Sequence, residues 1–415
     1  MKTIEQKAKK VPAIRFAGFE DEWVEKKLGD VAVSFGYGLN AAAKPYDGTN
    51  KYLRITDIDD SSRDFKKDDL TTPDFDLVKA NDYRLDEGDL LFARTGASVG
   101  KTFIYKKSDG LVYFAGFLIR AKIKSEYDSK FIFQNTLTNP YDKFVKITSQ
   151  RSGQPGINAQ EYADYSLLMP KLNEQQKIGS FFSNIDSLIS LEQKKYDKLM
   201  QVKKSMLEKM FPKEGATVPE IRFAGFSGDW KEKKLSDEFV DFIVPMRDKP
   251  KSFDGKIPWT RIEDIEGKFL NGSLSGQYVS EKTIAQMNLK VIPKNSLIVS
   301  SSATFGVVAV VTQDLVTNQT FIGLVPNDKE SLDFWYIFFY SDKAREYMKS
   351  QSAGSTIFYI ARESFENMPV MIPSREEQQK IGSYFSHLDS LISLQQRKLE
   401  KLKNIKKSLL EKMFV

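Results

Sequence analysis

Two blocks of this chain occur twice, and this duplication limits what the chain can fold into. Residues 11–28 and 218–235 are identical at 13 of 18 positions, with an offset of 207 residues. Residues 174–211 and 377–414 are identical at 27 of 38 positions, with an offset of 203 residues. The nearly equal offsets predict two half-molecules that share one framework.

The segments between the repeated blocks differ from each other. Residues 29–173 and 236–376 are similar in length but share little sequence. A common framework that carries unlike inserts suits a protein that recognises two different things at a fixed separation. The inserts are therefore the first place to look for specificity.

Composition excludes several kinds of site. The 415 residues, 41% of them hydrophobic, are enough for two to three domains with cores of their own. The chain has no cysteine, which excludes disulfides and thiolate ligands and is typical of an intracellular, cytoplasmic protein. His387 is the single histidine, and Asn184 stands at the matching position of the other half, so ordinary histidine metal sites are excluded.

Charge and hydropathy narrow the choice of partner. The net charge of +6 and the pI near 8.9 mildly favour an anionic partner such as nucleic acid. No run of about 18 apolar residues is present, so no membrane-spanning helix is expected. The N-terminal MKTIEQKAKK lacks the apolar stretch of a signal peptide.

The second repeated block has the pattern of a long helix. Its apolar residues recur at intervals of three, four and seven, and Pro212 follows the first copy directly. About 38 residues would span roughly 57 Å, and an isolated helix with one apolar face is not stable alone. We therefore expect the two copies to pack on each other through Ile178, Phe182, Ile185, Leu188, Leu199, Val202, Ile381, Phe385, Leu388, Leu391, Leu402 and Ile405.

The connections favour an antiparallel helix pair. The first helix leads through a short linker into the second half, so an antiparallel second helix would bring its end back to the first half and give a pseudo-twofold repeat. Capping boxes predict helix starts at Asn173 with Gln176 and at Ser374 with Glu377. Gly179 and Gly382 lie one turn inside the two helices, where glycine costs about 1 kcal/mol relative to alanine; either close approach of helices or mere tolerance of glycine would explain their presence.

Both inserts have the alternation and turn signals of mixed β structure with short helices. The predicted strands are Tyr52–Ile55, Asp89–Ala93, Thr102–Tyr105, Val112–Ile123, Ser296–Ser300, Val307–Val311 and Thr320–Val325. The predicted helices are Lys130–Leu137 and Leu332–Ser350. The fold class is thus α+β, with two mixed α/β domains separated by a long antiparallel two-helix coiled coil.

Four motifs occur in the same order in both halves. Each half opens on P-x-I-R-F-x-G-F-x-x-x-W and continues with R-I-x-D-I, at 54–58 and 261–265. A strand then enters a polar turn, and P-x-x-x-E-Q-Q-K-I-G leads into the long helix. Taken together over nearly the whole chain, these motifs resemble the DNA-specificity subunit of a type I restriction–modification enzyme.

The resemblance implies a non-catalytic subunit with two target-recognition domains, each for one half of a bipartite DNA site. It also implies that the helix pair sets the half-site spacing and docks two methyltransferase subunits, to which restriction–translocase subunits are added. S-adenosylmethionine, ATP and Mg would then be bound by those partners and none by this chain. Unlike inserts on a matched frame predict a target that is not palindromic.

The domains expected on this basis are a tail at 1–10, recognition domain one at 11–172, helix one at 173–211, a linker at 212–217, recognition domain two at 218–373 and helix two at 374–415.

Side chains that hydrogen-bond bases or phosphates gather in polar loops of each insert. The candidate DNA contacts of the first insert are Arg54, Arg94, Thr95, Lys101, Gln150, Arg151, Gln154 and Asn158. Those of the second insert are Arg261, Ser300, Ser301, Ser302, Thr304, Gln351, Ser352, Ser355, Thr356, Tyr359 and Arg362. Arg151 is the residue expected to read a base in one half-site only.

A self-contained DNA-modifying enzyme and a structural adaptor or silent cassette copy are the alternatives. Residues 34–38, with sequence SFGYG, have the wrong spacing for a cofactor loop and are expected to form a plain loop. Asn139-Pro140-Tyr141 lacks the second proline of an adenine-methyltransferase motif and is expected to be a helix-ending turn. Gly96–Thr102 lacks the first glycine of a phosphate-binding loop.

Overall fold

The computed structural model describes residues 10–151, 153–301, 306–352 and 359–415, and it divides the chain into two compact units. Unit 1 consists of residues 1–194 and 397–415, and unit 2 consists of residues 195–396. The boundary falls inside both long helices, so each unit contains part of each helix.

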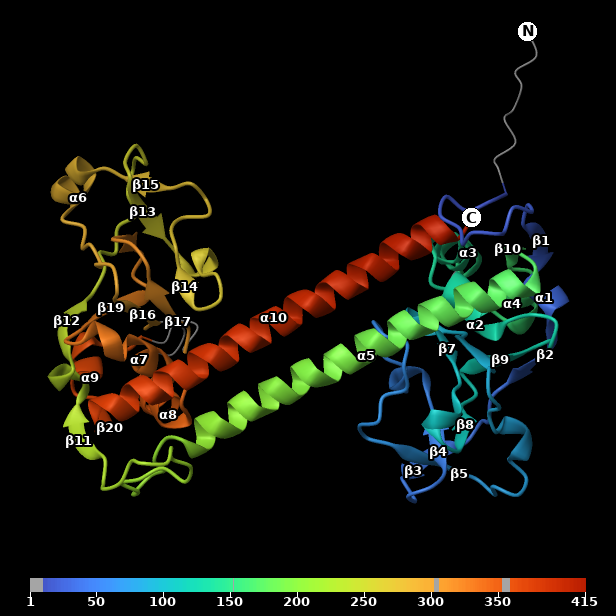
Figure 1. Ribbon diagram of the computed structural model, residues 1–415, viewed down its shortest axis with the longest axis horizontal. Helices are drawn as coiled ribbons and strands as arrows, with labels where there is room; N and C mark the ends of the chain where they lie inside the picture. The colour runs from blue at the N-terminus through green and yellow to red at the C-terminus, as the bar shows by residue number, and fades with distance from the viewer. Residues whose placement is uncertain (1–9, 152, 302–305, 353–358) are drawn as a thin grey trace, which may run out of the picture. The chain divides into compact units, whose positions relative to one another are not determined.

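Unit 1 contains most of the elements of the first half (Figure 1). In chain order they are β1 (Val24–Lys27), α1 (Leu28–Val31), β2 (Ala32–Tyr37), β3 (Ala42–Pro45), β4 (Lys51–Leu53), β5 (Thr71–Asp74), β6 (Leu90–Ala93), β7 (Thr102–Ile104), β8 (Val112–Phe114), β9 (Leu118–Ile123), α2 (Ser129–Asn135), α3 (Asn139–Thr148), α4 (Ala159–Ala163), β10 (Ser166–Met169) and the first part of α5 (Leu172–Lys209).

Unit 2 repeats this order with a few changes. Its elements are β11 (Lys231–Lys234), β12 (Phe239–Ile243), β13 (Ile257–Thr260), β14 (Phe269–Leu270), β15 (Tyr278–Val279), α6 (Glu281–Met287), β16 (Leu297–Ser300), β17 (Val308–Val311), β18 (Val316–Thr317), β19 (Phe321–Pro326), α7 (Leu332–Phe338), α8 (Asp342–Ser350), α9 (Arg362–Glu366), β20 (Pro369–Ile372) and the first part of α10 (Arg375–Met413).

The two inserts form sheets of the same topology although their sequences differ. The main sheet has the order β2-β9-β6-β7 in unit 1 and β12-β19-β16-β17-β14 in unit 2, with the first four strands antiparallel in both. A parallel pair lies beside each sheet, β4 with β8 and β13 with β18. The strand that precedes each long helix pairs with the strand after the opening motif, β10 with β1 and β20 with β11.

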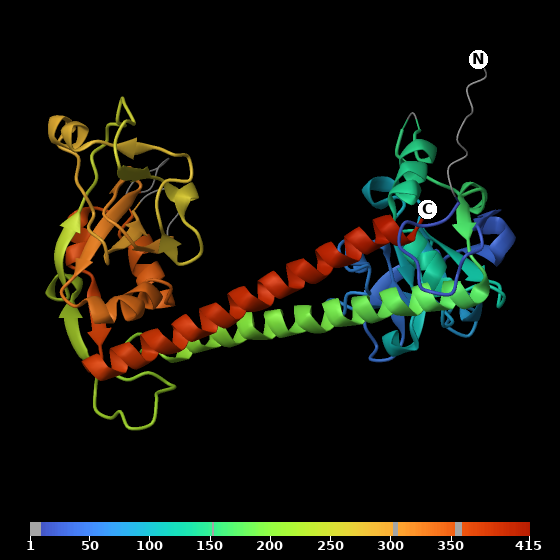
Figure 2. The ribbon, with the colours of Figure 1, turned by 45° about the horizontal axis from the view of Figure 1, so that its top comes forward.

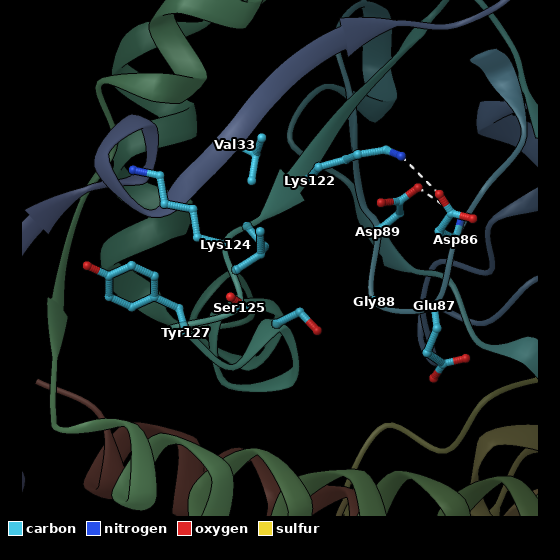
Figure 3. Close-up of a pocket in the computed structure, with 11 residues that line it drawn as sticks. Val33, Asp86, Glu87, Gly88, Asp89, Lys122, Lys124, Ser125 and Tyr127 are labelled. Atoms are coloured by element: carbon cyan, nitrogen blue, oxygen red, sulfur yellow. Dashed lines mark hydrogen bonds and ion pairs between the residues drawn. The ribbon is translucent and has the colours of Figure 1, made fainter.

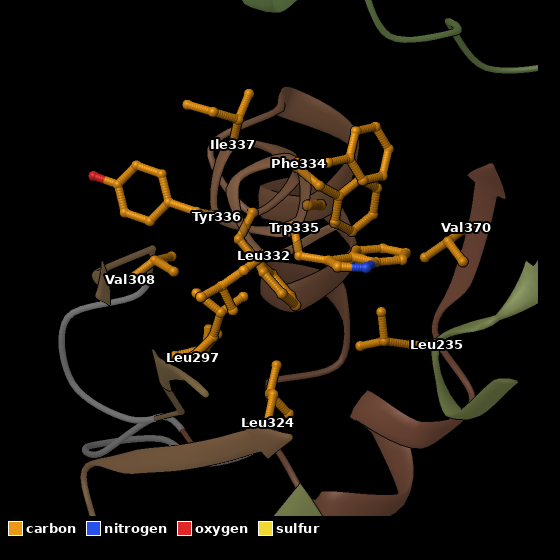
Figure 4. Close-up of a cluster of buried hydrophobic side chains, with 14 of the residues drawn as sticks. Leu235, Leu297, Val308, Leu324, Leu332, Phe334, Trp335, Tyr336, Ile337 and Val370 are labelled. Carbon is orange, nitrogen blue, oxygen red and sulfur yellow. The ribbon is translucent and has the colours of Figure 1, made fainter. Parts of the chain in front are cut away.

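A short helix covers one face of each sheet, and the core lies between them. In unit 2, Phe334 and Trp335 of α7 are fully buried and pack above Leu297 and Leu324 of the sheet (Figure 4). In unit 1, Phe131 of α2 has the corresponding role. Burial of large apolar side chains such as these is the main favourable term in folding.

Two glycines let each long helix approach these short helices closely. A Cβ at Gly179 would lie 2.9 Å from the amide nitrogen of Phe131 in α2. A Cβ at Gly382 would lie 2.8 Å from the amide nitrogen of Phe334 in α7. Close approach therefore accounts for both glycines, and the elements approached are the short helices of the inserts.

An ion pair fastens the opening motif of each unit to its long helix. Arg15 donates to both carboxylate oxygens of Glu174, at 2.7 and 2.8 Å, and Arg222 donates to both of Glu377, at 2.7 Å each. Both glutamates are at most 1% exposed. Hydrogen bonding to the Glu174 carboxylate raises the pKa of Arg15, so the guanidinium stays charged. The repeated arginine and the glutamate of the repeated E-Q-Q motif thus contact each other in both units.

The opening motif also holds the end of the other long helix. In unit 1 the Ile14 amide donates to the Lys412 carbonyl at 2.9 Å, and Phe414 lies against Trp23 and Phe131 at ring distances of 6.2 and 5.1 Å. Within this unit the last turns of α10 run beside the first turns of α5 in both views (Figures 1 and 2).

Unit 2 holds the end of α5 in the same way. The Ile221 amide donates to the Lys209 carbonyl at 2.9 Å, and Phe211 packs against Trp230 and Phe334 at 6.2 and 5.8 Å.

Within each unit the long helices are antiparallel. In unit 1, Lys398 pairs with Glu192 and Lys406 pairs with Asp186, so residue numbers rise along one helix as they fall along the other. In unit 2, Lys203 pairs with Asp389, the counterparts of Lys406 and Asp186.

Not all of the predicted helix-pair residues are buried. Those with little or no exposure are Ile178, Phe182, Ile381, Phe385 and Leu388. Those with intermediate exposure are Ile185, Leu199, Val202 and Leu402. The prediction was wrong for Leu188, Leu391 and Ile405, which are 39%, 53% and 41% exposed. The apolar stripe is wider than the contact, and the neighbouring Ile189 and Ile392 are the buried residues.

Several predicted element boundaries also need correction. Residues 112–123 form two strands, because the chain turns at 115–117, where the Gly116 amide donates to the Leu39 carbonyl. Residues 332–350 form two helices, because the Ser341 hydroxyl accepts from the Ala344 amide and starts α8. Helix α5 begins at Leu172, so Asn173 lies inside it and was wrongly predicted as its cap. Ser374 does precede α10, and its hydroxyl accepts from the Glu377 amide.

Candidate nucleic-acid interface

The loop that follows β6 is held rigidly at its base. The Tyr162 hydroxyl donates to the Ala93 carbonyl at 2.7 Å and accepts from the Gly100 amide at 3.2 Å. The Tyr141 hydroxyl donates to the Gly100 carbonyl at 3.1 Å. Burial raises the pKa of both tyrosines, so both phenols stay neutral donors. The polar turn predicted at residues 94–102 therefore stands on a buried, fixed base.

A second loop is bound to the first. The Gly96 amide donates to the Pro155 carbonyl at 3.0 Å, and the Ile157 amide donates to the Arg94 carbonyl at 2.9 Å. Thr95 and Gly156 form an isolated antiparallel bridge. The structure thus brings together Arg94 and Thr95 with Gln154, candidates that are about 60 residues apart in the sequence. Gln150 lies at the start of the second loop and is exposed.

Two aromatic residues that the sequence did not identify belong to this surface. Tyr37, at the end of β2, is 45% exposed, and its ring lies 5.0 Å from the guanidinium carbon of Arg94. Phe117 is 61% exposed, and its carbonyl accepts from the Arg94 amide. Tyr37 was missed because residues 34–38 were wrongly predicted to be a loop. Residues 34–37 lie in strand β2. An aromatic residue at the end of a strand was the signal in the sequence that could have identified Tyr37.

The other first-insert candidates are already paired within the protein. Arg54 donates to Asp57 at 2.8 and 2.9 Å, and Arg151 pairs with Glu161 and with the carbonyls of residues 148 and 150. The Asn158 side chain caps α4 by accepting from the Glu161 amide. Lys101 is 7% exposed and donates to the Ile58 carbonyl. These side chains shape the surface, and any contact of theirs with DNA stays a prediction.

In unit 2 the two corresponding loops are joined by the equivalent backbone hydrogen bond. The Ile360 amide donates to the Ser301 carbonyl at 2.9 Å, as that of Ile157 does to Arg94. Ser300 and Ser301 are 1% and 3% exposed, whereas Tyr359 is 43% exposed. The corresponding loops therefore present different side chains on one scaffold.

The remaining second-insert candidates are distributed around these loops. Arg362, at the start of α9, pairs with Glu366 at 2.6 Å and with Asp241 at 3.6 Å. Gln351 and Ser352 follow α8, and the Ser352 hydroxyl donates to the Lys349 carbonyl. The candidates that lie outside the described residues are Ser302, Thr304, Ser355 and Thr356.

The repeated R-I-x-D-I motif has a structural role in both units. The Arg54 amide donates to Asp57 at 2.9 Å, and the Arg261 amide donates to Asp264 at 2.7 Å, each closing a short 3-10 turn. Arg261 also lies over Trp259 and pairs with Glu263. The motif recurs because the turn recurs.

A polar depression on unit 1, lined by β9 and the turn before β6, does not suit a nucleic acid (Figure 3). Asp86 pairs with Lys122 at 2.9 Å and its amide donates to Asp89, while Glu87 accepts from the Lys107 amide. Three carboxylates here face two lysines, Lys122 and Lys124. The carboxylates here outnumber the lysines, so the depression is unfavourable for a phosphate.

Asn139-Pro140-Tyr141 begins α3, with proline in its first turn, so the prediction of a helix-ending turn was wrong.

Among the described residues, no group of three or more His, Asp or Glu side chains could hold a metal ion. The helices in the described ranges include none that is long and apolar enough to cross a membrane.

Comparisons with known proteins agree on one family. Residues 20–201 and 228–404 match the family model described as the type I restriction modification DNA specificity domain. A Methanocaldococcus jannaschii protein named for the specificity subunit of the MjaX type I restriction enzyme is 24% identical over 94% of this chain and 92% of its own length. The HindI specificity subunit of Haemophilus influenzae is 20% identical over 92% of this chain and 97% of its own.

Solved structures share the fold. The S subunit of a type I restriction–modification system from M. genitalium matches with a TM-score of 0.59 at 15% identity, over 98% of this chain and 99% of that one. A chain from a study of the assembly and conformational transition of a type I system matches with a TM-score of 0.53 at 15% identity, over 94% and 97%. These matches confirm the predicted fold class of two mixed α/β domains with a long helix pair.

Proposed function

The chain belongs to the type I restriction modification DNA specificity family, and we propose that its two recognition domains, residues 11–172 and 218–373, each read one half of an asymmetric bipartite DNA site. One observation carries the proposal. Both units hold a pair of loops by the same backbone bond, from Ile157 to Arg94 and from Ile360 to Ser301, yet the side chains at the matched positions differ. Equal scaffolds with unequal side chains suit two unlike half-sites.

The chain acts as a non-catalytic specificity subunit. In this proposal the adenine methylation, with S-adenosylmethionine, and the ATP- and Mg-dependent cleavage belong to partner subunits. The role of this chain is to bind double-stranded DNA and to place those partners on it. Methyl transfer by the isolated chain would contradict this assignment.

Matched apolar patches on the long helices support the docking of two methyltransferase subunits. Leu188 and Leu191 on α5 are 39% and 49% exposed, and their counterparts Leu391 and Leu394 on α10 are 53% and 58% exposed. Large apolar side chains exposed on the solvent side of a helix are typical of a docking surface. Since the patch occurs once on each helix, it suits two copies of one partner, and translocase subunits would join through them.

The long helices suit a role in setting the half-site spacing. Helix α5 has 38 residues and α10 has 39, and neither contains a proline. Each long helix begins in one unit and ends in the other. The two units are therefore connected by two helices and by no loop. We propose that this connection, made of two helices, sets one spacer length.

The test is binding of the purified chain, with its methyltransferase partner, to duplexes that contain the site. We expect tight binding at one spacer length and a large loss when the spacer changes by one base pair. Permuted half-sites at the correct spacing serve as a control for sequence recognition. Equal affinity at all spacer lengths would contradict the spacing role, and equal affinity for all sequences would contradict the recognition role.

A further inference from the structure

The backbone of Arg94 is held on both sides. Its amide donates to the Phe117 carbonyl at 3.1 Å, and its carbonyl accepts from the Ile157 amide at 2.9 Å. The next residue, Thr95, bridges to Gly156. Two segments therefore fix the backbone of Arg94, so the starting point of its side chain is defined before any ligand binds.

The side chain of Arg94 is also held in place. Its guanidinium carbon lies 5.0 Å from the centre of the Tyr37 ring, in cation–π geometry. The Tyr37 hydroxyl accepts from the Ala159 amide at 3.2 Å, so the ring is itself fixed to the start of α4. Stacking on a fixed ring restricts the plane of the guanidinium, and this lowers the entropy lost when it hydrogen-bonds.

Arg94 differs from the other arginine candidates of unit 1 in its pairing. Arg54 is paired with Asp57 and Arg151 with Glu161. Among the described residues no carboxylate pairs with Arg94, and its buried Nε–H donates no hydrogen bond. Since Nε is buried, the Nη1 and Nη2 atoms form the donor edge that this side chain can offer.

We propose that Arg94 reads a guanine in the half-site of the first recognition domain, with Tyr37 as its positioning residue; this inference rests on the proposed function. Two parallel N–H donors match the O6 and N7 acceptors that guanine presents in the major groove. A guanidinium can also bind a phosphate through two N–H donors. A fixed guanidinium plane favours the base, because a base edge presents its acceptors in one plane, and the variants below test the phosphate alternative.

The second half-site is read differently. Ser301 takes the backbone place of Arg94, because its carbonyl accepts from the Ile360 amide and its own amide donates to the Thr320 carbonyl. Ser301 is 3% exposed and carries no charge. Position 301 therefore cannot make a guanine contact of the Arg94 kind, so the two halves differ at this matched position.

The experiment uses the complex of the full chain with its methyltransferase partner and duplexes with single base changes across the first half-site. Wild type should lose about 5- to 150-fold in affinity when the contacted guanine is replaced by another base. Replacement by 7-deazaguanine, which lacks N7, should also lower affinity. Inosine, which keeps O6 and N7 and lacks only the minor-groove amino group, should not.

Variants of the chain separate base contact from phosphate contact. Arg94→Ala should bind all bases at that position, and 7-deazaguanine, with equal affinity. Arg94→Lys keeps the charge but not the paired donors, so it should retain overall binding and lose discrimination. Tyr37→Ala should weaken discrimination at the same position, and Tyr37→Phe, which keeps the ring, should restore most of it.

The outcomes distinguish this inference from the proposed function. A bipartite preference in wild type that persists unchanged in Arg94→Ala would overturn the inference alone. An equal loss of affinity for every sequence in Arg94→Ala would mark a phosphate contact and also overturn it. Absence of any site preference in wild type would overturn both.

Discussion

The contact between Arg15 and Glu174 explains why two distant motifs recur together. Arg15 is 13% exposed at its side chain and Glu174 is 1% exposed, and the pair is bidentate. Loss of one partner leaves a buried charge unpaired, which is the costly case for an ion pair. The same reasoning applies to Arg222 and Glu377 in unit 2.

Replacing Glu174 by alanine should therefore destabilise unit 1 by about 3 kcal/mol. Chemical denaturation of the variant, followed by tryptophan fluorescence, measures the change. The double variant Arg15→Met with Glu174→Leu should recover much of the loss, because no unpaired charge remains. Lys171→Ala removes an exposed pair with Asp21 and should leave the transition unchanged. A Glu174→Ala transition equal to wild type would contradict the account.

At the residue scale, sequence reasoning found the polar loops but not the state of each side chain. It could place Arg94 and Arg151 in loops before the long helix. It could not show that Arg151 meets Glu161 while Arg94 meets Tyr37, because those pairings depend on how β2, α4 and the two loops come together. We therefore propose Arg94, in place of Arg151, as the residue that reads a base.

The ends of the long helices are elements of the recognition-domain cores. Phe414 is 6% exposed and contacts Trp23, Phe131 and Phe182. Phe211 has the matching position in unit 2. The repeat E-K-M-F at both helix ends is thus explained by packing, whereas the sequence suggested only a helix pair.

Phe414→Ala should destabilise unit 1 by about 3–5 kcal/mol, since it removes a buried ring between three others. Phe211→Ala should have the same effect on unit 2, and Val415→Ala, at an exposed position, is the control. The measurement is a thermal unfolding curve for each variant. Equal unfolding of Phe414→Ala and Val415→Ala would show that the helix end is not part of the core.

Periodicity predicted the long helices well and the short elements less well. A strict apolar repeat over 38 residues has few structural solutions. The turn at 115–117 and the break at Ser341 are set by local hydrogen bonds that hydropathy does not show. The exposed Leu188 and Leu391 reflect a different error. The whole apolar stripe of each long helix was assigned to its contact with the other long helix.

For the whole molecule, the most informative finding is the shared topology of two unlike inserts. Both sheets carry a bulge at the same point, with Val33 and Val240 each 68% exposed. The inserts differ in sequence at most positions and share only short motifs such as R-I-x-D-I, so the sequence did not show that their sheets correspond strand by strand. Backbone register shows that one architecture was retained while the side chains diverged.

Because residues 195–211 match residues 398–414, a chain cut after residue 211 should dimerise. In each copy, Met210 and Phe211 of the other copy would fill the place of Met413 and Phe414 in unit 1. Light scattering during size-exclusion chromatography should give twice the mass of the half chain, and Phe211→Ala should shift it to monomer. A folded monomer of the unaltered half chain would contradict this interchangeability.

The central claim is that two unlike recognition domains on a matched frame read one asymmetric bipartite site. Methylome sequencing of cells with and without this chain tests it most directly. The account predicts one adenine-methylated motif that depends on the chain, with two different half-sites and a single gap length. A palindromic or ungapped motif, or the same methylation in its absence, would contradict the account.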